Sequence, residues 1–165
     1  MEALEAIRSR RSIRKYTEGT ISEEQLRQIL EAGRWAATKG NKQPWKFIIL
    51  QDRAVRDELA TTLTTGKFLS QAPVGIAVTI NTDNSPEAPL DGAAATQNML
   101  LAAHALGLGA CWISAYDTAS ENEAKRILHI PDDERLLSVV SLGHPAEAPQ
   151  KEKKDFEDIT FIDKL

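Results

Sequence analysis

The residues best suited to chemistry lie in one short run near the start of the chain, Ser9-Arg10-Arg11-Ser12-Ile13-Arg14-Lys15-Tyr16. This arginine run places four cations close together, although the whole chain has a formal net charge of −4. A local positive focus on an acidic molecule indicates a small anionic ligand, because nucleic acid would favour a broadly basic surface. Phosphate is the natural candidate, since arginine offers a rigid fork of donors that lysine does not reproduce.

A second basic cluster lies far away in the sequence, at Lys151, Lys153 and Lys154. Together the two clusters predict a site in which distant segments converge on one phosphate. Each also has a plainer interpretation. The arginine run is compatible with a solvated helix end, whose cations lie near the negative end of the helix dipole, and the lysines with a solvated polar tail.

A polar loop forms the next candidate, Thr38-Lys39-Gly40-Asn41-Lys42-Gln43-Pro44-Trp45. The amides of Asn41 and Gln43 each offer a donor and an acceptor, which suits the edge of a heterocycle or a sugar hydroxyl. Gly40 lets main chain approach a flat ligand closely. The alternative interpretation is a turn between a helix and a strand, with Trp45 as a core residue.

The familiar catalytic motifs are missing from the sequence. It has no nucleophile elbow, no Walker lysine loop, no Gly-x-Gly-x-x-Gly after a strand and no HExxH zinc signature. The single cysteine, Cys111, is expected to be a small buried apolar residue, and His104 a packed or interface residue. His129 and His144 complete a set of three histidines without zinc-ligand spacing, so no metal site is expected. A bound cofactor is therefore the expected source of any chemistry.

Length and composition place the chain among ordinary globular domains. With 165 residues and 42% hydrophobic residues, we expect one domain over residues 1–165. The first residues show no secretory leader, and no apolar run reaches the roughly 18 residues that cross a bilayer, so we expect a cytoplasmic protein without a membrane partner.

Apolar spacing and turn residues predict an α+β domain in which helices cover a mixed sheet. A short first helix through Leu4 and Ile7 ends near the arginine run, and Ser22 to Gln25 has the form of a capping box. Helices are expected over residues 23–37, 54–63, 91–106 and 118–128, and strands over 46–50, 74–80, 110–114 and 136–142, with Gly143-His144-Pro145 breaking the last. A long loop is expected over residues 81–90. The helix over 91–106 is almost uncharged, so it is expected to be buried nearly all round, as a central spine or an oligomer interface.

These segments together resemble the FMN-dependent nitroreductase family, short-chain type. The resemblance is carried, in the family's order, by Arg10-Arg11-Ser12-Ile13-Arg14, Ile29-Leu30-Glu31-Ala32 leading to Asn41-x-Gln43-Pro44-Trp45, Gln97-Asn98-Met99-Leu100-Leu101-Ala102-Ala103, Leu106-Gly107-Leu108-Gly109 with Trp112, and Gly143-His144-Pro145. It covers nearly the whole chain. It implies an intertwined homodimer with a central, mixed but mainly antiparallel sheet, and an FMN in each of two clefts between the subunits.

The resemblance also implies roles for individual residues. Arg10, Arg11 and Ser12 match the phosphate end of the cofactor, with Lys154 and its neighbour Lys153 joining from the C-terminal segment. Arg14 matches the pyrimidine edge of the flavin, where a guanidinium would stabilise negative charge. The remaining matches lie along the ring system: Thr38, Lys39 and Asn41 where the second subunit packs, and Ile113 and Ser114 near the reactive nitrogen.

The reaction implied is a ping-pong cycle in which NADH or NADPH passes hydride to flavin N5 and a small acceptor, such as a nitroaromatic or quinone, then takes its place. Arg14 would give electrostatic support, with no catalytic side chain. The chain departs from the family at Ala37-Thr38, where Pro-Ser is usual, and at Lys39, where a small residue is common. The segment before Thr118 also lacks a sizeable insertion, so the substrate pocket is expected to be compact.

Three alternatives stay open at this stage. A flavin- or nucleotide-binding sensor or carrier would share every cofactor contact but show no turnover. A specialised relative would destroy flavin, remove halogen or oxidise azolines. A structural interaction domain with basic patches would bind no flavin. The apolar tail Ile159-Thr160-Phe161-Ile162 favours a homodimer, because a monomer has little reason to expose it.

Overall fold

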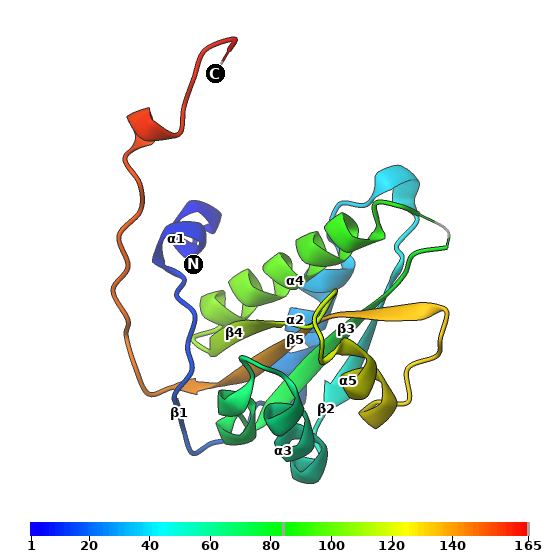
Figure 1. The fold of residues 1–165 in the computed structure, drawn as a ribbon. Coiled ribbons are helices and arrows are strands. Elements are labelled where there is room, and N and C mark those ends of the chain that lie inside the picture. Colours follow the sequence, from blue (N-terminus) through cyan, green and yellow to red (C-terminus); the bar gives the residue numbers. More distant parts are fainter. Residues whose placement is uncertain (84, 165) are drawn as a thin grey trace.

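The computed structural model describes residues 1–83 and 85–164, and it shows a five-stranded sheet with helices on both faces (Figure 1). The helices and strands are α1 (Ala3–Ser9), β1 (Tyr16–Thr17), α2 (Glu23–Arg34), β2 (Trp45–Leu50), α3 (Arg53–Thr62), β3 (Val74–Asn81), α4 (Ala88–Ala105), β4 (Gly109–Ser114), α5 (Glu121–Ile127) and β5 (Glu134–Pro145). Short 3-10 turns cover Lys39–Asn41, Lys67–Gln71 and Phe156–Asp158.

The sheet runs β2-β3-β5-β4, with β1 paired to the end of β5. All five strands pair antiparallel, and the parallel contact seen in the described residues is an isolated bridge between Ser12 and Ala110. The predicted α+β class with a mainly antiparallel sheet is thus confirmed. Strand β1 is an element that the sequence did not predict, because two residues carry too little pattern.

Two apolar cores lie on opposite faces of the sheet. Successive residues of β3 point to opposite faces of the sheet. Ile76 and Val78 pack under α2 and α4, whereas Ala77 faces α3 and α5. Figure 1 shows α4 above the sheet and α3 and α5 below it. Burial on both faces explains why this strand is almost entirely apolar in sequence. Trp45 is buried, as expected of a core residue.

The helix ends follow local signals closely. The capping box of α2 is present, since Ser22 Oγ accepts from the Gln25 N–H and the Gln25 side chain accepts from the Ser22 N–H. Gly107, with φ of 78°, ends α4 in a Schellman motif, in which the Leu108 N–H donates to the Ala103 carbonyl.

Helices α2 and α4 each have one boundary that differs clearly from the prediction. Helix α2 ends at Arg34 instead of residue 37, because Ala36 turns into the core and leaves Trp35 75% exposed. Helix α4 starts at Ala88, with Pro89 in its first turn, so the predicted loop over residues 81–90 is shorter.

Helix α4 is not buried nearly all round by its own chain, so that prediction is wrong for the single chain. Its buried side includes Gly92, Met99 and Ala103, whereas Leu90 is 71% exposed and Gln97 and Ala105 are exposed. Low charge along a helix predicts burial but does not say whether its own chain or another covers each side.

The segment Gly143-His144-Pro145 does not break β5, as the sequence had predicted, but completes it. Gly143 pairs with Gly109 of β4, and His144 and Pro145 pair with β1. A Cβ at Gly143 would lie 2.6 Å from the Tyr16 ring and 2.8 Å from Pro73. The glycine is therefore required for close packing of a neighbouring side chain and not for a turn.

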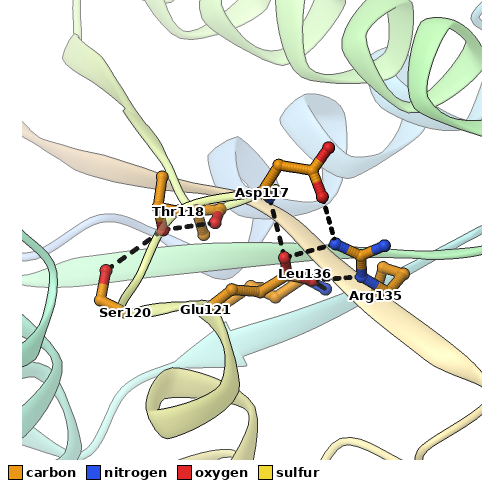
Figure 2. Close-up of polar contacts among 7 residues, drawn as sticks. Asp117, Thr118, Ser120, Glu121, Arg135 and Leu136 are labelled. Carbon is orange, nitrogen blue, oxygen red and sulfur yellow. Dashed lines mark hydrogen bonds and ion pairs between the residues drawn. The ribbon is translucent and has the colours of Figure 1, made fainter.

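A cluster of charged side chains fixes the connection between β4 and α5 (Figure 2). The buried carboxylate of Glu121 accepts from Arg135 Nε and Nη2, both at 2.7 Å, and from the Asp117 and Leu136 N–H groups at 2.9 and 3.2 Å. Arg135 also pairs with Asp117 at 2.6 Å and lies over the Tyr116 ring. The Thr118 hydroxyl donates to the Ala115 carbonyl, so the chain turns there and α5 starts at Glu121, three residues later than predicted.

These contacts decide the ionisation of Glu121. Burial by itself raises the pKa of Glu121, but the hydrogen bonds from Arg135 and the two main-chain amides, with the arginine charge, outweigh it. The pKa therefore lies below the ordinary glutamate value, and the carboxylate is charged at neutral pH.

The C-terminal tail leaves the body of the domain (Figure 1). In residues 150–164 every side chain is exposed, and the tail forms a single 3-10 turn but no strand. Its apolar side chains have no cover from their own chain, with Phe156 70% and Ile162 88% exposed.

We expect Gly143→Ala to destabilise the fold by about 1–3 kcal/mol, because the added methyl group overpacks the site beneath Tyr16. Chemical unfolding at one protein concentration would measure the loss. The same substitution in a Tyr16→Ala background is expected to cost less, because the ring is then absent. Equal costs in both backgrounds would show that the ring is not what the glycine accommodates.

We expect Glu121→Gln to lower the free energy of unfolding at neutral pH by about 2 kcal/mol, through the loss of charge-assisted hydrogen bonds. A depressed carboxyl pKa stabilises the fold above the unfolded value of about 4.3, and the contribution is lost as pH falls through the folded value. The difference between wild type and variant should therefore shrink in unfolding curves as pH falls below the unfolded value. A constant difference across this range would contradict the assignment.

Candidate functional site

The arginine run is held against the sheet by two side chains on either side of Arg14, those of Ile13 and Tyr16. The Ile13 N–H donates to the Ala110 carbonyl at 3.0 Å, and Ile13 is 7% exposed. Its side chain occupies the space above Gly109, where a Cβ would lie 2.8 Å from it. This docking places the run beside the first residues of β4.

Tyr16 makes the second anchor of the run. Its hydroxyl donates to the Ile13 carbonyl at 2.7 Å and lies 2.6 Å from Ser141 Oγ. Burial raises the pKa of Tyr16 far above its usual value, so the phenol stays protonated. Tyr16 is a packing and hydrogen-bonding residue rather than an acid or base.

A cavity of about 170 Å³ lies between the arginine run and the strap, the name used here for residues 146–154. Its lining is mostly cationic and comes from both segments: Arg10, Arg11, Ser12, Arg14, Pro149, Lys151 and Lys153. The structure thus brings together two basic clusters more than a hundred residues apart. The predicted convergence of the two segments is seen, although the lysines differ in part from those expected.

The strap lysines on the cavity are Lys151 and Lys153, while Lys154 is not among the residues that line it. Lys151 was missing from the residues assigned by family resemblance. The signal that could have found it is the spacing of the cluster, since residues 151 and 153 project to the same side of an extended chain.

Two donors at the cavity are buried without a hydrogen-bond partner in the described residues, Arg10 Nη1 and Arg11 Nε. Among these residues the guanidinium groups of Arg10, Arg11 and Arg14 also take part in no ion pair. Buried donors without partners are costly, and cations of one sign repel each other. An anion with several acceptor oxygens, such as a phosphate, would satisfy both requirements.

Arg14 lines the same cavity and contacts an aromatic side chain. Its guanidinium carbon lies 5.7 Å from the centre of the Phe68 ring, within the range of a cation–π contact. Arg14 as a whole is exposed. Arg14 therefore lies at the exposed edge of the cationic cavity.

A larger cavity of about 470 Å³ adjoins the first and shares Arg11 and Pro149 with it. Apolar residues, including Ile13 and Leu108, form much of its wall. His104 also lines it, and its Nε2 lies 2.7 Å from Ser9 Oγ. Burial and then the charges of Arg10 and Arg11 lower the pKa of His104, so the ring is neutral at neutral pH. It is half-buried and hydrogen-bonded, in line with the expected packing role.

The polar loop of residues 38–45 lies at the other end of α4. The Thr38 hydroxyl donates to Asp91 Oδ2 at 2.9 Å, and the Lys39 N–H donates to Asp91 Oδ1 at 3.3 Å. The Lys39 amine pairs with Glu87. Asn41 has φ of 56°, and its side-chain oxygen accepts from Gln43. The loop is thus pinned to the first turns of α4.

Asp91 is an anchor that the sequence argument missed. It is 7% exposed and is the only charged residue between Pro89 and Ala103. A single acid in an otherwise uncharged helix needs partners when buried, and that signal was available in the sequence.

The predicted site residues therefore form two groups. The arginine run meets α4 near His104, and the loop meets it at Asp91, thirteen residues away and about 20 Å along the helix axis. One small ligand cannot lie between both groups within a single chain. The structure brings together most of the residues predicted to hold a phosphate but does not bring Thr38, Lys39 and Asn41 to them.

Strand β4 leads away from the cationic cavity towards the last two predicted residues. Ala110 lies beside Ser12, and Ser114 is four residues further on, about 13 Å along the strand. Ser114 is exposed and free to contact a ligand. The Ile113 side chain is fully buried in the core beneath α3, so only its main chain is available for such a contact.

The described residues contain no cluster of His, Cys, Asp or Glu side chains able to hold a metal ion. Cys111 is 1% exposed, and burial raises the pKa of its thiol, so it behaves as the small buried residue expected. Across the part of the chain described here, no helix is both long enough and apolar enough to cross a membrane.

Comparison with known proteins places this fold and site in a family. The model of the Nitroreductase family matches residues 7–65 and 60–144. A relative from Archaeoglobus fulgidus, provisionally assigned as an NADH dehydrogenase/NAD(P)H nitroreductase, is 39% identical over 161 residues, covering 94% of this chain and 89% of its own.

Solved structures agree over the full length. A protein from Bacteroides thetaiotaomicron with the same provisional assignment is 35% identical, with a TM-score of 0.92 and 96% of both chains covered. A nitroreductase-like protein from Desulfovibrio desulfuricans, solved in complex with FMN, is 34% identical, with a TM-score of 0.87 and coverage of 100% of this chain and 98% of its own. The resemblance drawn from the sequence motifs is confirmed, and the chain belongs to the nitroreductase family.

Proposed function

We propose that this protein binds FMN and is an NAD(P)H-dependent oxidoreductase that reduces a small acceptor such as a nitroaromatic or a quinone. The observation that carries the proposal is the cationic cavity with two buried, unpartnered arginine donors. The FMN complex of the Desulfovibrio desulfuricans relative and the NAD(P)H in the Archaeoglobus fulgidus relative's name support the choice of cofactor and reductant.

The residues present fit the phosphate end of FMN. Arg10 and Arg11 supply guanidinium donors, Ser12 supplies a hydroxyl, and Lys151 and Lys153 close the opposite side. A phosphate of this kind carries close to two negative charges at neutral pH, which the surrounding cations would neutralise. The small cavity volume suits a single phosphate group rather than a polyanion.

The rest of the cofactor would follow β4 from the phosphate cavity towards Ser114. Arg14 extends from the cavity edge and brings a positive charge to the ring side, where it would stabilise negative charge. Bound FMN supplies the chemistry, since its ring accepts electrons from NADH or NADPH and gives them to the acceptor. The chain binds the cofactor, orients it and sets its electrostatic surroundings.

The side chains near the run offer no competing catalyst. Tyr16 is half-buried and Cys111 is buried, both with raised pKa values, and the pKa of His104 is lowered by burial and by its cationic neighbours, so its ring is neutral. None of the three is set up to act as a nucleophile. This arrangement supports chemistry on a cofactor rather than on the protein.

The site is completed by a second copy of the chain in this proposal. The two groups of predicted residues lie about 20 Å apart along α4, so Thr38, Lys39 and Asn41 would have to come from a partner. An apolar groove of about 370 Å³ between α1, α2 and α4 includes Ile7, Trp35 and Leu101. This groove and the uncovered apolar tail are surfaces of the kind that homodimers bury.

FMN affinity and reduction test the cofactor and the activity. We expect wild-type protein to bind FMN, and NADH or NADPH to bleach its yellow absorbance without oxygen, with recovery on adding a quinone or nitroaromatic. Arg10→Gln should weaken FMN binding about 10- to 100-fold, because a charge-assisted hydrogen bond to phosphate is lost. The matched control is Arg27→Gln, which changes an exposed arginine of α2.

Binding without bleaching by either nucleotide would favour a flavin carrier or sensor over an enzyme. Consumption of the flavin itself would favour a specialised relative. Wild-type protein that stays colourless after incubation with FMN would contradict the whole proposal.

Sedimentation tests the dimer. The 18.2 kDa chain is expected to sediment at twice this mass at micromolar concentration. Trp35→Ala should weaken association at least about tenfold, since a large aromatic side chain would leave a buried interface. Glu58→Gln changes an exposed residue of α3, on the other face of the sheet, and serves as the control. A wild-type chain that stays monomeric under these conditions would rule out a shared site.

A further inference from the structure

The strap joins the arginine run through one side chain, Glu147. Its Oε1 accepts from the main-chain N–H of Arg14 at 2.6 Å and from that of Lys15 at 3.2 Å. The N–H of the preceding residue, Ala146, donates to the Lys15 carbonyl at 2.9 Å. Strands β1 and β5 pair only as far as Tyr16 and Pro145, so these bonds extend the attachment beyond the last strand pair.

Past Glu147 the strap has no further polar attachment in the described residues. From residue 148 to residue 154, no hydrogen bond or ion pair to the rest of the chain is seen there. Lys151 and Lys153 nevertheless form one side of the cationic cavity. Glu147 is therefore the last fixed point before the lysines, and it determines where they start from.

The negative charge of Glu147 would oppose the binding of an anion in the neighbouring cavity. Glu147 is a carboxylate close to a cavity built for an anion, and by Coulomb repulsion alone it would weaken phosphate binding. Its hydrogen bonds go to main-chain amides rather than to the guanidinium groups, so the arginine charges are left for the ligand. The geometry points to a role for its acceptor atom and not for its charge.

We propose that Glu147 is a positioning residue that holds the strap against Arg14 and Lys15, so that Lys151 and Lys153 meet the phosphate opposite the arginines. The inference rests on the proposed function, because it takes the ligand to be FMN. It predicts that the acceptor oxygen of residue 147 controls recognition of the phosphate and leaves recognition of the flavin ring unchanged.

The test compares FMN with riboflavin, which has the same ring system but no phosphate. Titration of flavin-free protein with each ligand gives two dissociation constants, and their ratio measures the contribution of the phosphate. Glu147→Ala should lower this preference for FMN about tenfold, with the riboflavin constant within twofold of wild type, because the released strap would lose about one lysine contact with the phosphate. Glu147→Gln keeps the acceptor oxygen and removes the charge, so its preference should equal or exceed that of wild type.

Glu152→Ala, which removes an exposed carboxylate of the same strap, is the control and should leave the ratio unchanged. If Glu147→Ala does not fold, Glu147→Asp replaces it, because the shorter side chain keeps the charge and loses the reach. A preference for FMN retained in the alanine or aspartate variant would overturn the inference, as would an equal loss in Glu147→Gln. If wild type binds neither flavin, the proposed function fails and the inference fails with it.

Discussion

The site depends on a pair of glycines that face each other across two strands. Gly109 of β4 and Gly143 of β5 are register partners, and in an antiparallel pair such partners point to the same face of the sheet. Ile13 lies against the first glycine and Tyr16 against the second, both at distances that a Cβ would not allow. The two side chains flank Arg14, so the missing Cβ atoms fix the arginine run on the sheet.

Charge is distributed so that the run keeps its cations free. Several arginines and lysines elsewhere pair with carboxylates, as Arg135 does with Glu121, Arg126 with Glu123 and Lys46 with Glu134. The acid nearest to the run, Glu147, instead accepts from main-chain amides. A chain with net negative charge thus keeps a small, local positive field, which is the arrangement that selects a small anion over a long one.

The polar clusters at the two ends of α4 serve different parts of the proposed site. Asp91 holds the loop of residues 38–45, and the contact between Ser9 and His104 holds the end of α1. Because the helix separates these clusters, neither can complete the other within one chain. The fold therefore gives a physical reason for a proposed active site shared between two copies.

The sequence by itself determined the elements whose signals are local. The Ser22 capping box, the Gly107 helix end and the β-branched strand at residues 74–80 lie where short-range hydrogen bonding and side-chain periodicity place them, and the arginine run was visible as a charge cluster. The motifs in their order were enough to indicate the family.

Only the tertiary structure decided which distant residues meet. Strand register put Ser12 beside Ala110 and made Gly143 the surface on which Tyr16 packs, rather than a break in β5. The path of the strap placed Lys151 rather than Lys154 at the cavity. Tertiary packing also gave Asp91 and Glu147 their partners, 53 and 133 residues away at Thr38 and Arg14. Such contacts depend on how whole elements pack and on where a Cβ is missing, and no window of neighbouring residues contains that information.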